Sequence, residues 1–171
     1  MKKLGIPLVI LLAQATPSAA WESTEGGAVA RPRETNTTIL GISVHCVEGP
    51  VIAVYSKDDG PVLPAGDPKA TADYFYRPGA VRALVDGKAF PLAAAGSDDA
   101  VVLFTEGEEA HSYLAPLDLG LIAAMRGGKS LSLEFDITAA KAGDGTALES
   151  FARFDLAGAS TAIGAAVKAC V

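Results

Sequence analysis

Apolar and polar residues alternate strictly over residues 130–138, where Leu131, Leu133, Phe135 and Ile137 are separated by polar side chains. A period of two is typical of a strand with one buried and one solvent-facing side. Shorter runs of residues that favour β-strands recur along the chain, at 39–47, 51–55, 72–77, 81–85, 88–92, 100–104 and 150–156. The pattern therefore predicts seven or eight strands.

The run 39–47 also indicates which side chains face the core. Its alternation places Leu40, Ile42, Val44 and Cys46 on one side, with Ser43 and His45 on the other. Glu48-Gly49-Pro50 then turns the chain, and the run 51–55 returns as the second arm of a hairpin.

The strongest local turn signal is Asp86-Gly87, which separates the runs 81–85 and 88–92. A two-residue Asp-Gly connection between strands favours a type I′ turn, which needs a positive φ at Gly87. We therefore predict a tight β-hairpin here.

Two stretches carry the helical period instead. In the first, Asp118 is placed to cap a helix and Gly127-Gly128 to end it, with Leu121, Ile122 and Met125 facing inward. In the second, Ser160 is expected to cap a helix over residues 161–169. One face of that helix carries Ile163, Ala166, Val167 and Cys170.

These elements lack the alternating strand–helix rhythm of a parallel sheet. We predict a mainly β protein, an antiparallel β-sandwich or open barrel with two short helices, one of them at the C-terminus. A single β-rich domain is expected over residues 38–171. It follows a polar, glycine-containing leader over residues 21–37, in which Trp21 is expected to be a packing anchor.

The first twenty residues have the layout of a secretory signal peptide. Met1-Lys2-Lys3 is basic, residues 4–12 are almost wholly apolar, and small residues precede a cut before Trp21. A cut after Ala15 is the alternative. This layout predicts an exported protein, periplasmic or secreted. The apolar run is too short to span about 30 Å of hydrocarbon, so we expect no stable membrane span after cleavage.

The chain has two cysteines, Cys46 and Cys170. In an exported protein the simplest arrangement is one disulfide between them, which would close the fold. Two free thiols or an intermolecular bridge are the alternatives.

The chain is acidic, with 20 Asp and Glu residues against 14 Lys and Arg residues and a formal net charge of −6. Nucleic acid is therefore not an expected partner, because phosphates require basic surfaces. A cationic protein partner is compatible with this charge. The oligomeric state is left open.

Two glycine-containing stretches resemble catalytic motifs without completing them. The stretch 158–162 lacks the last glycine of a nucleophile elbow around Ser160, and no histidine follows it. Gly127-Gly128-Lys129-Ser130 stands in helix-to-strand order, the reverse of a phosphate-binding loop. We interpret the first as a helix cap and the second as a helix stop.

Metal sites are also not indicated. His45 and His111 are too few for zinc unless carboxylates complete the site. The acidic pairs Asp58-Asp59, Asp98-Asp99 and Glu108-Glu109 lack the spacing of a calcium loop. We expect no cofactor and no metal, and a carboxylate pair for sugar hydrolysis stays open because its geometry is three-dimensional.

One loop combines features of a partner-binding surface. Residues 106–113 contain acidic side chains, a glycine, a titratable imidazole and an aromatic ring, in a position between a strand and a helix. Loops on a rigid β scaffold often carry recognition, although most charged loops are solvated connectors. The candidate binding residues are Glu106, Glu108, Glu109, His111 and Tyr113.

The chain resembles small exported proteobacterial proteins, namely the invasion-associated locus B family and the VasI/TagO-type accessory proteins of type VI secretion. The resemblance rests on a signal peptide, an apolar strand ending in Cys46, a leucine-containing helix before Gly127-Gly128-Lys129, and a final helix ending at Cys170. It implies a periplasmic or secreted β-sandwich with an accessory or binding role and no known catalysis.

Three functions follow as hypotheses. The first is an exported, non-enzymatic accessory or binding protein of the cell envelope. The second is a proteinaceous inhibitor of a cationic envelope hydrolase, with the acidic loop over Glu106–Glu109 as its plug. The third is a periplasmic hydrolase with a scattered carboxylate site, which the missing nucleophile and metal motifs disfavour.

Overall fold

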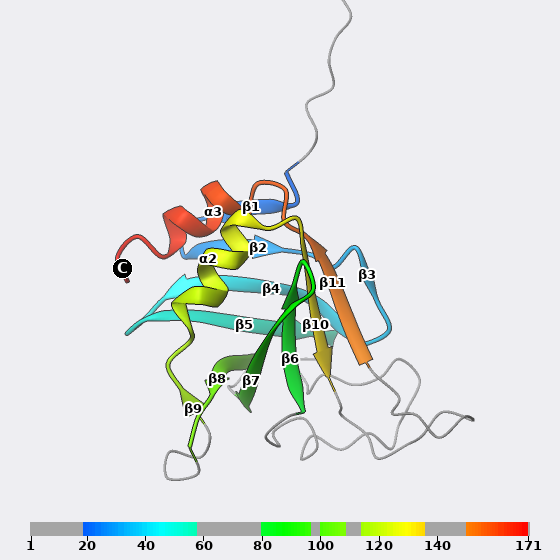
Figure 1. The fold of residues 1–171 in the computed structure, drawn as a ribbon. Helices are drawn as coiled ribbons and strands as arrows, with labels where there is room; N and C mark the ends of the chain where they lie inside the picture. The colour runs from blue at the N-terminus through cyan, green and yellow to red at the C-terminus, as the bar shows by residue number, and fades with distance from the viewer. Residues whose placement is uncertain (1–18, 58–79, 97–99, 109–113, 136–149, 171) are drawn as a thin grey trace, which may run out of the picture.

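The computed structural model describes residues 19–57, 80–96, 100–108, 114–135 and 150–170, whose fold is drawn in Figure 1. The strands of this part of the chain form one antiparallel sheet in the order β1-β2-β4-β5-β8-β7-β6-β10-β11-β3, with β9 paired to β8. They are β1 (Trp21–Thr24), β2 (Gly27–Ala30), β3 (Glu34–Thr35), β4 (Ile39–Cys46), β5 (Pro50–Ser56), β6 (Val81–Val85), β7 (Lys88–Gly96), β8 (Val101–Glu106), β9 (Leu114–Ala115), β10 (Ser130–Phe135) and β11 (Ser150–Asp155).

The helices of the described ranges are α2 (Leu119–Gly127) and α3 (Ala159–Ala166). The predicted class is therefore confirmed: the protein is mainly antiparallel β, with two short helices, one at the C-terminus. The sheet is open rather than closed into a barrel, because β1 and β3 stand at its two ends.

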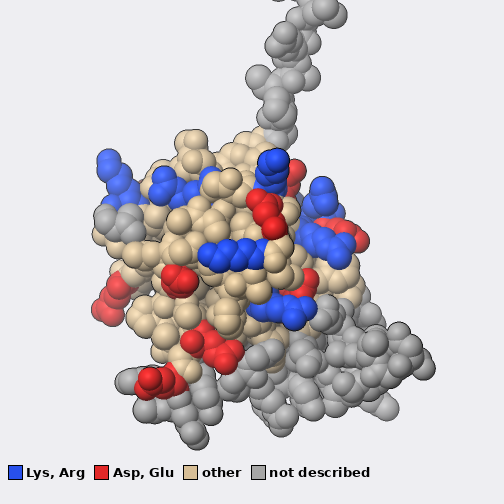
Figure 2. Space-filling view, viewed as in Figure 1, with Lys and Arg blue, Asp and Glu red and all other residues tan. Residues whose placement is uncertain are grey.

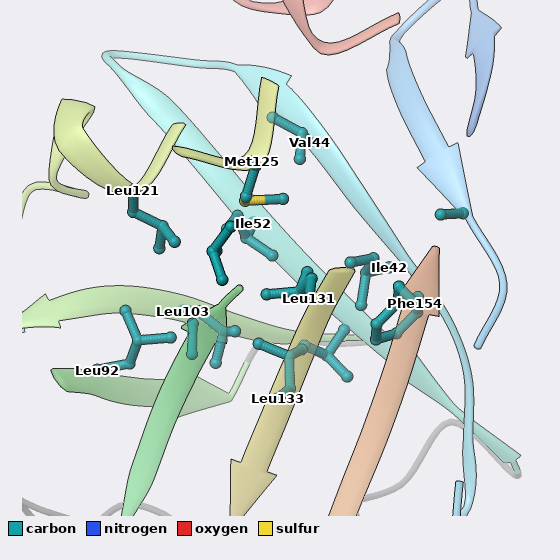
Figure 3. Close-up of a cluster of buried hydrophobic side chains, with 14 of the residues drawn as sticks. Ile42, Val44, Ile52, Leu92, Leu103, Leu121, Met125, Leu131, Leu133 and Phe154 are labelled. Atoms are coloured by element: carbon teal, nitrogen blue, oxygen red, sulfur yellow. The ribbon is translucent and has the colours of Figure 1, made fainter. Parts of the chain in front are cut away.

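The sheet curls around one hydrophobic core, which is shown in Figure 3. Leu121 and Met125 point from α2 into this core, and both are fully buried. Full burial of such a side chain stabilises the fold by about 1.5–3 kcal/mol. The sheet contributes, from β4, β5, β10 and β11, the buried side chains Ile42, Val44, Ile52, Leu131, Leu133 and Phe154.

The predicted hairpin is confirmed. β6 and β7 pair from Val85↔Lys88 outward, so Asp86 and Gly87 are the two turn residues. Their φ angles are 48° and 85°, the left-handed values that a type I′ turn requires. Nothing lies within 4 Å of a Cβ built on Gly87, so the demand for glycine there comes from the backbone angle rather than from crowding.

The helix after Asp118 is confirmed with its cap. The Asp118 carboxylate accepts the Gly120 backbone N–H at 2.7 Å, and Gly128 ends the helix by donating its N–H to the Ala124 carbonyl at 2.7 Å. Leu121, Ile122 and Met125 are buried as predicted. A Cβ on Gly128 would lie 2.7 Å from Val85 Cγ1, so glycine lets the helix end pack against the hairpin.

The prediction that Ser160 caps the last helix is wrong. α3 begins at Ala159, its N-cap is Gly158 with a φ of 85°, and no side chain caps it. The glycine reverses the chain after β11 in a left-handed conformation that serine rarely adopts. Ser160 is therefore an exposed residue of the first turn.

The predicted disulfide between Cys46 and Cys170 is present, with the two Cα atoms 5.8 Å apart. It joins the end of β4 to the segment after α3, across a sequence separation of 124 residues. The segment after α3 is thereby fastened to β4, a strand that α3 also contacts. The alternatives of free thiols and of an intermolecular bridge do not describe this structure, in which no cysteine is free.

Residues 21–37, expected to be a polar leader, contain β1, β2 and β3. The sequence pattern gave no strand signal here, because the inward positions are filled mostly by small residues such as Ala28 and Ala30. Trp21 is the large side chain that anchors this segment in the core, and it is only 2% exposed. Its expected role as a packing anchor agrees with this burial.

Leu40 does not face the core with Ile42 and Val44, as the alternation predicted. A shift in the β4–β5 register between Ile39 and Gly41 turns Ile39 inward, where it is 3% exposed, and leaves Leu40 59% exposed. Such a bulge adds one residue to one strand and reverses the facing of its neighbours.

Several sequence predictions fall outside the described residues. These are the signal peptide up to residue 18, the strand over 72–77, and the acidic pairs Asp58-Asp59 and Asp98-Asp99. Among the described residues, no helix is both long and apolar enough to cross a membrane.

Candidate functional site

The two ends of the open sheet approach each other along a seam between β1 and β11, which are not neighbours in the sheet order. Isolated hydrogen bonds hold this seam. The Ala20 backbone N–H donates to the Ala157 carbonyl, and the Trp21 indole Nε1–H donates to the Asp155 carbonyl, both at 3.0 Å. The open sheet is thus fastened at one point instead of being closed by a ladder.

The outer edge of β11 is covered by the segment that crosses from β2 to β4. The Arg33 N–H donates to the Arg153 carbonyl at 2.7 Å, and the Asn36 side chain accepts the Phe151 N–H at 2.6 Å. Thr35 Oγ1 donates to the Phe151 carbonyl at 2.7 Å. This crossing segment occupies an edge that would otherwise be available for pairing with another chain.

A cleft of about 820 Å³ lies beside the seam, and we call it the seam cleft. Strands β1, β2, β4 and β5 contribute most of its wall, and Asp155 closes it from the β11 side. The lining residues are Ala20, Glu22, Val29, Ala30, Arg31, Arg33, Leu40, Gly41, Ile42, Tyr55 and Asp155.

The strand register explains why these side chains share one wall. Glu22 is paired with Val29, and Gly41 is paired with Tyr55. Directly paired residues of antiparallel strands point to the same face, about 4.5–5.5 Å apart. Gly41 adds no bulk, and a Cβ there would lie 3.0 Å from the Ala30 carbonyl oxygen. The bulge before it turns Leu40 out toward the cleft.

A small hydrogen-bonded cluster holds Tyr55 at the cleft. The Ser43 hydroxyl lies 3.3 Å from the Tyr55 hydroxyl and 3.2 Å from His45 Nδ1. Ser43 is 6% exposed, so it is poorly placed to attack a substrate. Because His45 precedes Cys46, the cluster also links the cleft to the strand end that carries the disulfide.

The charges at the cleft are mixed. Arg31 and Arg33 are exposed and flank Pro32 on the crossing segment, while Glu22 and Asp155 bring two carboxylates. Asp155 already accepts the Ala157 N–H at 2.7 Å. Exposed apolar groups beside guanidinium groups suit a ligand with an apolar part and a polar or anionic part.

The described residues of the sequence-predicted binding loop, Glu106 and Glu108, do not line the seam cleft. Glu106 ends β8 and pairs with Leu114 of β9, so the loop joins two paired strands, and neither strand contributes to the seam cleft. Glu108 is exposed. The remaining predicted binding residues, Glu109, His111 and Tyr113, lie outside the described residues.

The residues of the rejected motifs are not brought together. His45 bonds to Ser43, Ser160 is on the surface of α3, and Lys129 begins the turn into β10. Among the described residues, no group of three or more His, Cys, Asp or Glu side chains is arranged to hold a metal ion.

No local sequence pattern marks the seam cleft. Its wall combines residues 20–33 with 40–42, Tyr55 and Asp155, and no local pattern joins these segments. The available signal was the pair Arg31 and Arg33, two closely spaced basic residues in an acidic chain.

Comparison of the chain with protein-family models, with curated proteins and with solved structures found no match. Function is therefore inferred from the geometry of the seam and of the surface around it.

Proposed function

We propose that this protein is an exported, non-enzymatic binding protein of the cell envelope, periplasmic or secreted, and that it binds its ligand in the seam cleft. The observation that carries the proposal is the cleft itself, about 820 Å³ in volume and lined by Leu40, Val29 and Tyr55 together with two arginines. Ligand sites are typically concave and largely apolar, with a few polar groups that fix orientation.

The polar groups of the cleft suit binding better than catalysis. A nucleophile has to be reached by its substrate and activated by a base. Ser43, the residue nearest to that description, is almost buried and bonds to both His45 and Tyr55. Its role in this proposal is to position the tyrosine ring.

Export is supported by the disulfide, since disulfides persist in oxidising compartments. The proposed leader over residues 1–20 would deliver the chain there. Fractionation of expressing cells, combined with trapping of free thiols, tests this part: we expect an oxidised protein outside the cytoplasm, and a reduced cytoplasmic protein would contradict it.

Binding in the cleft is tested with phenylnaphthylamine, an uncharged fluorescent probe with an apolar body. We expect saturable binding to the folded protein and about a tenfold weaker affinity after Leu40→Asp, a change of about 1.4 kcal/mol. Leu119→Asp is the matched control, because Leu119 of α2 is similarly exposed, 52% against 59% for Leu40, and lies away from the cleft. Equal binding by both variants would reject the seam cleft as the site.

A second candidate surface is the acidic loop after β8. Its support is the pairing of Glu106 with Leu114 at the two ends of this loop, since loops on a rigid scaffold commonly carry recognition. In this alternative the loop contacts a cationic partner, including a cationic envelope hydrolase that it would inhibit.

A further inference from the structure

A second, smaller hollow adjoins the seam cleft. Its volume is about 320 Å³, and we call it the basic hollow because three of its lining residues are cations that come from three separate segments. These are Arg33 of the crossing segment, Lys129 before β10, and Arg153 of β11. The two hollows share Arg33 and Asp155, so one ligand would reach both by passing these residues.

The positive charge of the basic hollow is only partly balanced. Arg153 pairs with Glu34 at 2.9 Å and stacks over the Phe151 ring at 4.2 Å. Arg33 and Lys129 have no carboxylate within ion-pair distance in the described part of the chain. Convergent cations repel one another in proportion to their proximity, so an anion between them would lower the energy of the site.

Nearby carboxylates offset part of this charge. Asp155 lines the hollow and accepts the Ala157 N–H, and Asp86 attracts Lys129 while accepting hydrogen bonds from Lys129 and Ser130. Figure 2 shows basic and acidic side chains interspersed in the upper and right parts of this view, and mainly acidic ones in the lower left. The lining of the hollow itself holds three cations against one carboxylate, on a chain of net charge −6.

We propose that the ligand is an amphipathic organic anion, whose carboxylate, sulfonate or phosphate head lies in the basic hollow between Arg33 and Lys129 and whose apolar body lies in the seam cleft. Guanidinium and ammonium groups are the usual partners of such heads. The apolar body covers Leu40 and Val29 and packs against Tyr55. This inference rests on the proposed binding function and adds to it the chemical class of the ligand.

The test compares two fluorescent probes that differ in one group. Anilinonaphthalene sulfonate carries an anionic sulfonate, and phenylnaphthylamine is its uncharged analogue. Both are titrated into the full folded protein at low and at high salt. We expect the sulfonate probe to bind about tenfold more tightly at low salt and to lose that advantage as salt is added.

Two substitutions locate the head group. Arg33→Gln and Lys129→Gln should each weaken binding of the sulfonate probe about fivefold to tenfold, the range expected for one charge-assisted contact, and leave phenylnaphthylamine binding unchanged. The matched controls Arg126→Gln and Lys168→Gln remove the same charge from α2 and from the segment after α3. They should bind both probes as the wild type does.

The outcomes separate the two proposals. If phenylnaphthylamine binds but Arg33→Gln and Lys129→Gln bind the sulfonate probe as tightly as the controls do, the anion inference is overturned and the binding cleft survives. If inorganic phosphate alone displaces the sulfonate probe as effectively as an amphipathic carboxylate does, the ligand is a free anion and the amphipathic class is wrong. If neither probe binds, the seam cleft itself is rejected.

Discussion

The indole N–H of Trp21 donates a hydrogen bond to the backbone carbonyl of Asp155 at 3.0 Å, across a sequence separation of 134 residues. In the uncut chain this contact, together with the Ala20–Ala157 bond, fastens the first strand to the other end of the open sheet, and only the Trp21 contact remains after a cut before Trp21.

Replacement of Trp21 by Phe should therefore destabilise the protein. The change keeps an aromatic ring but removes the donor to Asp155 and leaves space in a site where the side chain is 2% exposed. We expect a loss of about 1–3 kcal/mol in the free energy of unfolding, measured by urea denaturation followed by circular dichroism. A loss below about 0.5 kcal/mol, the level of ordinary surface changes, would mean that the seam is held by other contacts.

Reduction of the disulfide should lower the melting temperature strongly. A cross-link that closes a loop of this length stabilises the fold by about 4–5 kcal/mol in the chain-entropy model, and the separation here is 124 residues. For a domain of this size the shift should be on the order of 10 °C or more, measured by calorimetry with and without reductant. The double variant Cys46→Ser, Cys170→Ser should melt lower than the wild type and ignore reductant. Two titratable thiols in the folded exported protein would contradict the bridge.

Gly27→Ala should destabilise the protein, because a Cβ on Gly27 would overlap the Val44 carbonyl oxygen and lie 3.1 Å from the His45 Cβ. Forced overlap of this kind costs about 1–3 kcal/mol. The adjacent Gly26 is the control, since nothing lies within 4 Å of a Cβ placed there. Chemical denaturation of Gly27→Ala and Gly26→Ala measures the contrast, and equal stabilities would show that β2 shifts to make room.

Asp86 should make stability depend on pH in the acid range. The Lys129 and Ser130 backbone N–H groups, which donate to its carboxylate, hold the pKa of Asp86 below its ordinary value. Because the pKa is lower in the folded state, the carboxylate stabilises the fold at pH values above the unfolded pKa of about 3.9. That contribution is lost as the pH falls through the folded pKa.

Asp86→Asn isolates this effect, since asparagine accepts the positive φ of a type I′ turn. Wild-type stability should fall more steeply than that of the variant as the pH is lowered from about 5 to about 2, measured by urea denaturation at each pH. Parallel curves would show that the Asp86 charge contributes nothing.

The acidic-loop alternative has its own test. Replacing Glu106, Glu108 and Glu109 together by Gln should slow association with a cationic partner at low salt and leave the melting temperature nearly unchanged, since charges of this kind chiefly steer association. The rates are measured by surface plasmon resonance with a cationic partner captured from envelope extract. Glu25→Gln with Glu48→Gln, both at exposed positions outside the loop, is the charge control. A wild-type rate for the triple variant would make the loop a connector only.

Sequence reasoning succeeded where the signal was local. The Asp86-Gly87 turn and the cap and stop of α2 each depend on a few adjacent residues, and the structure has them where the pattern predicted. The disulfide followed from the presence of only two cysteines.

The failures have equally physical causes. The direction of Leu40 depends on a bulge, and alternation cannot reveal one added residue. The strands within 21–37 have small inward side chains, which give no apolar alternation. The hydrogen-bond partner of Trp21 is Asp155, 134 residues further along the chain, so no local pattern indicates it. The seam cleft and the basic hollow exist only because the two sheet ends meet, so no local pattern contains them.

The burial of Trp21 also sets an order of events for maturation. A peptidase needs the chain extended and accessible on both sides of the bond that it cuts. In the folded protein, Trp21 is enclosed and the Ala20 N–H is bonded to Ala157, so the bond between these two residues is held inside the seam. If the leader is removed before Trp21, the cut has to come before the first strand is seated in the seam.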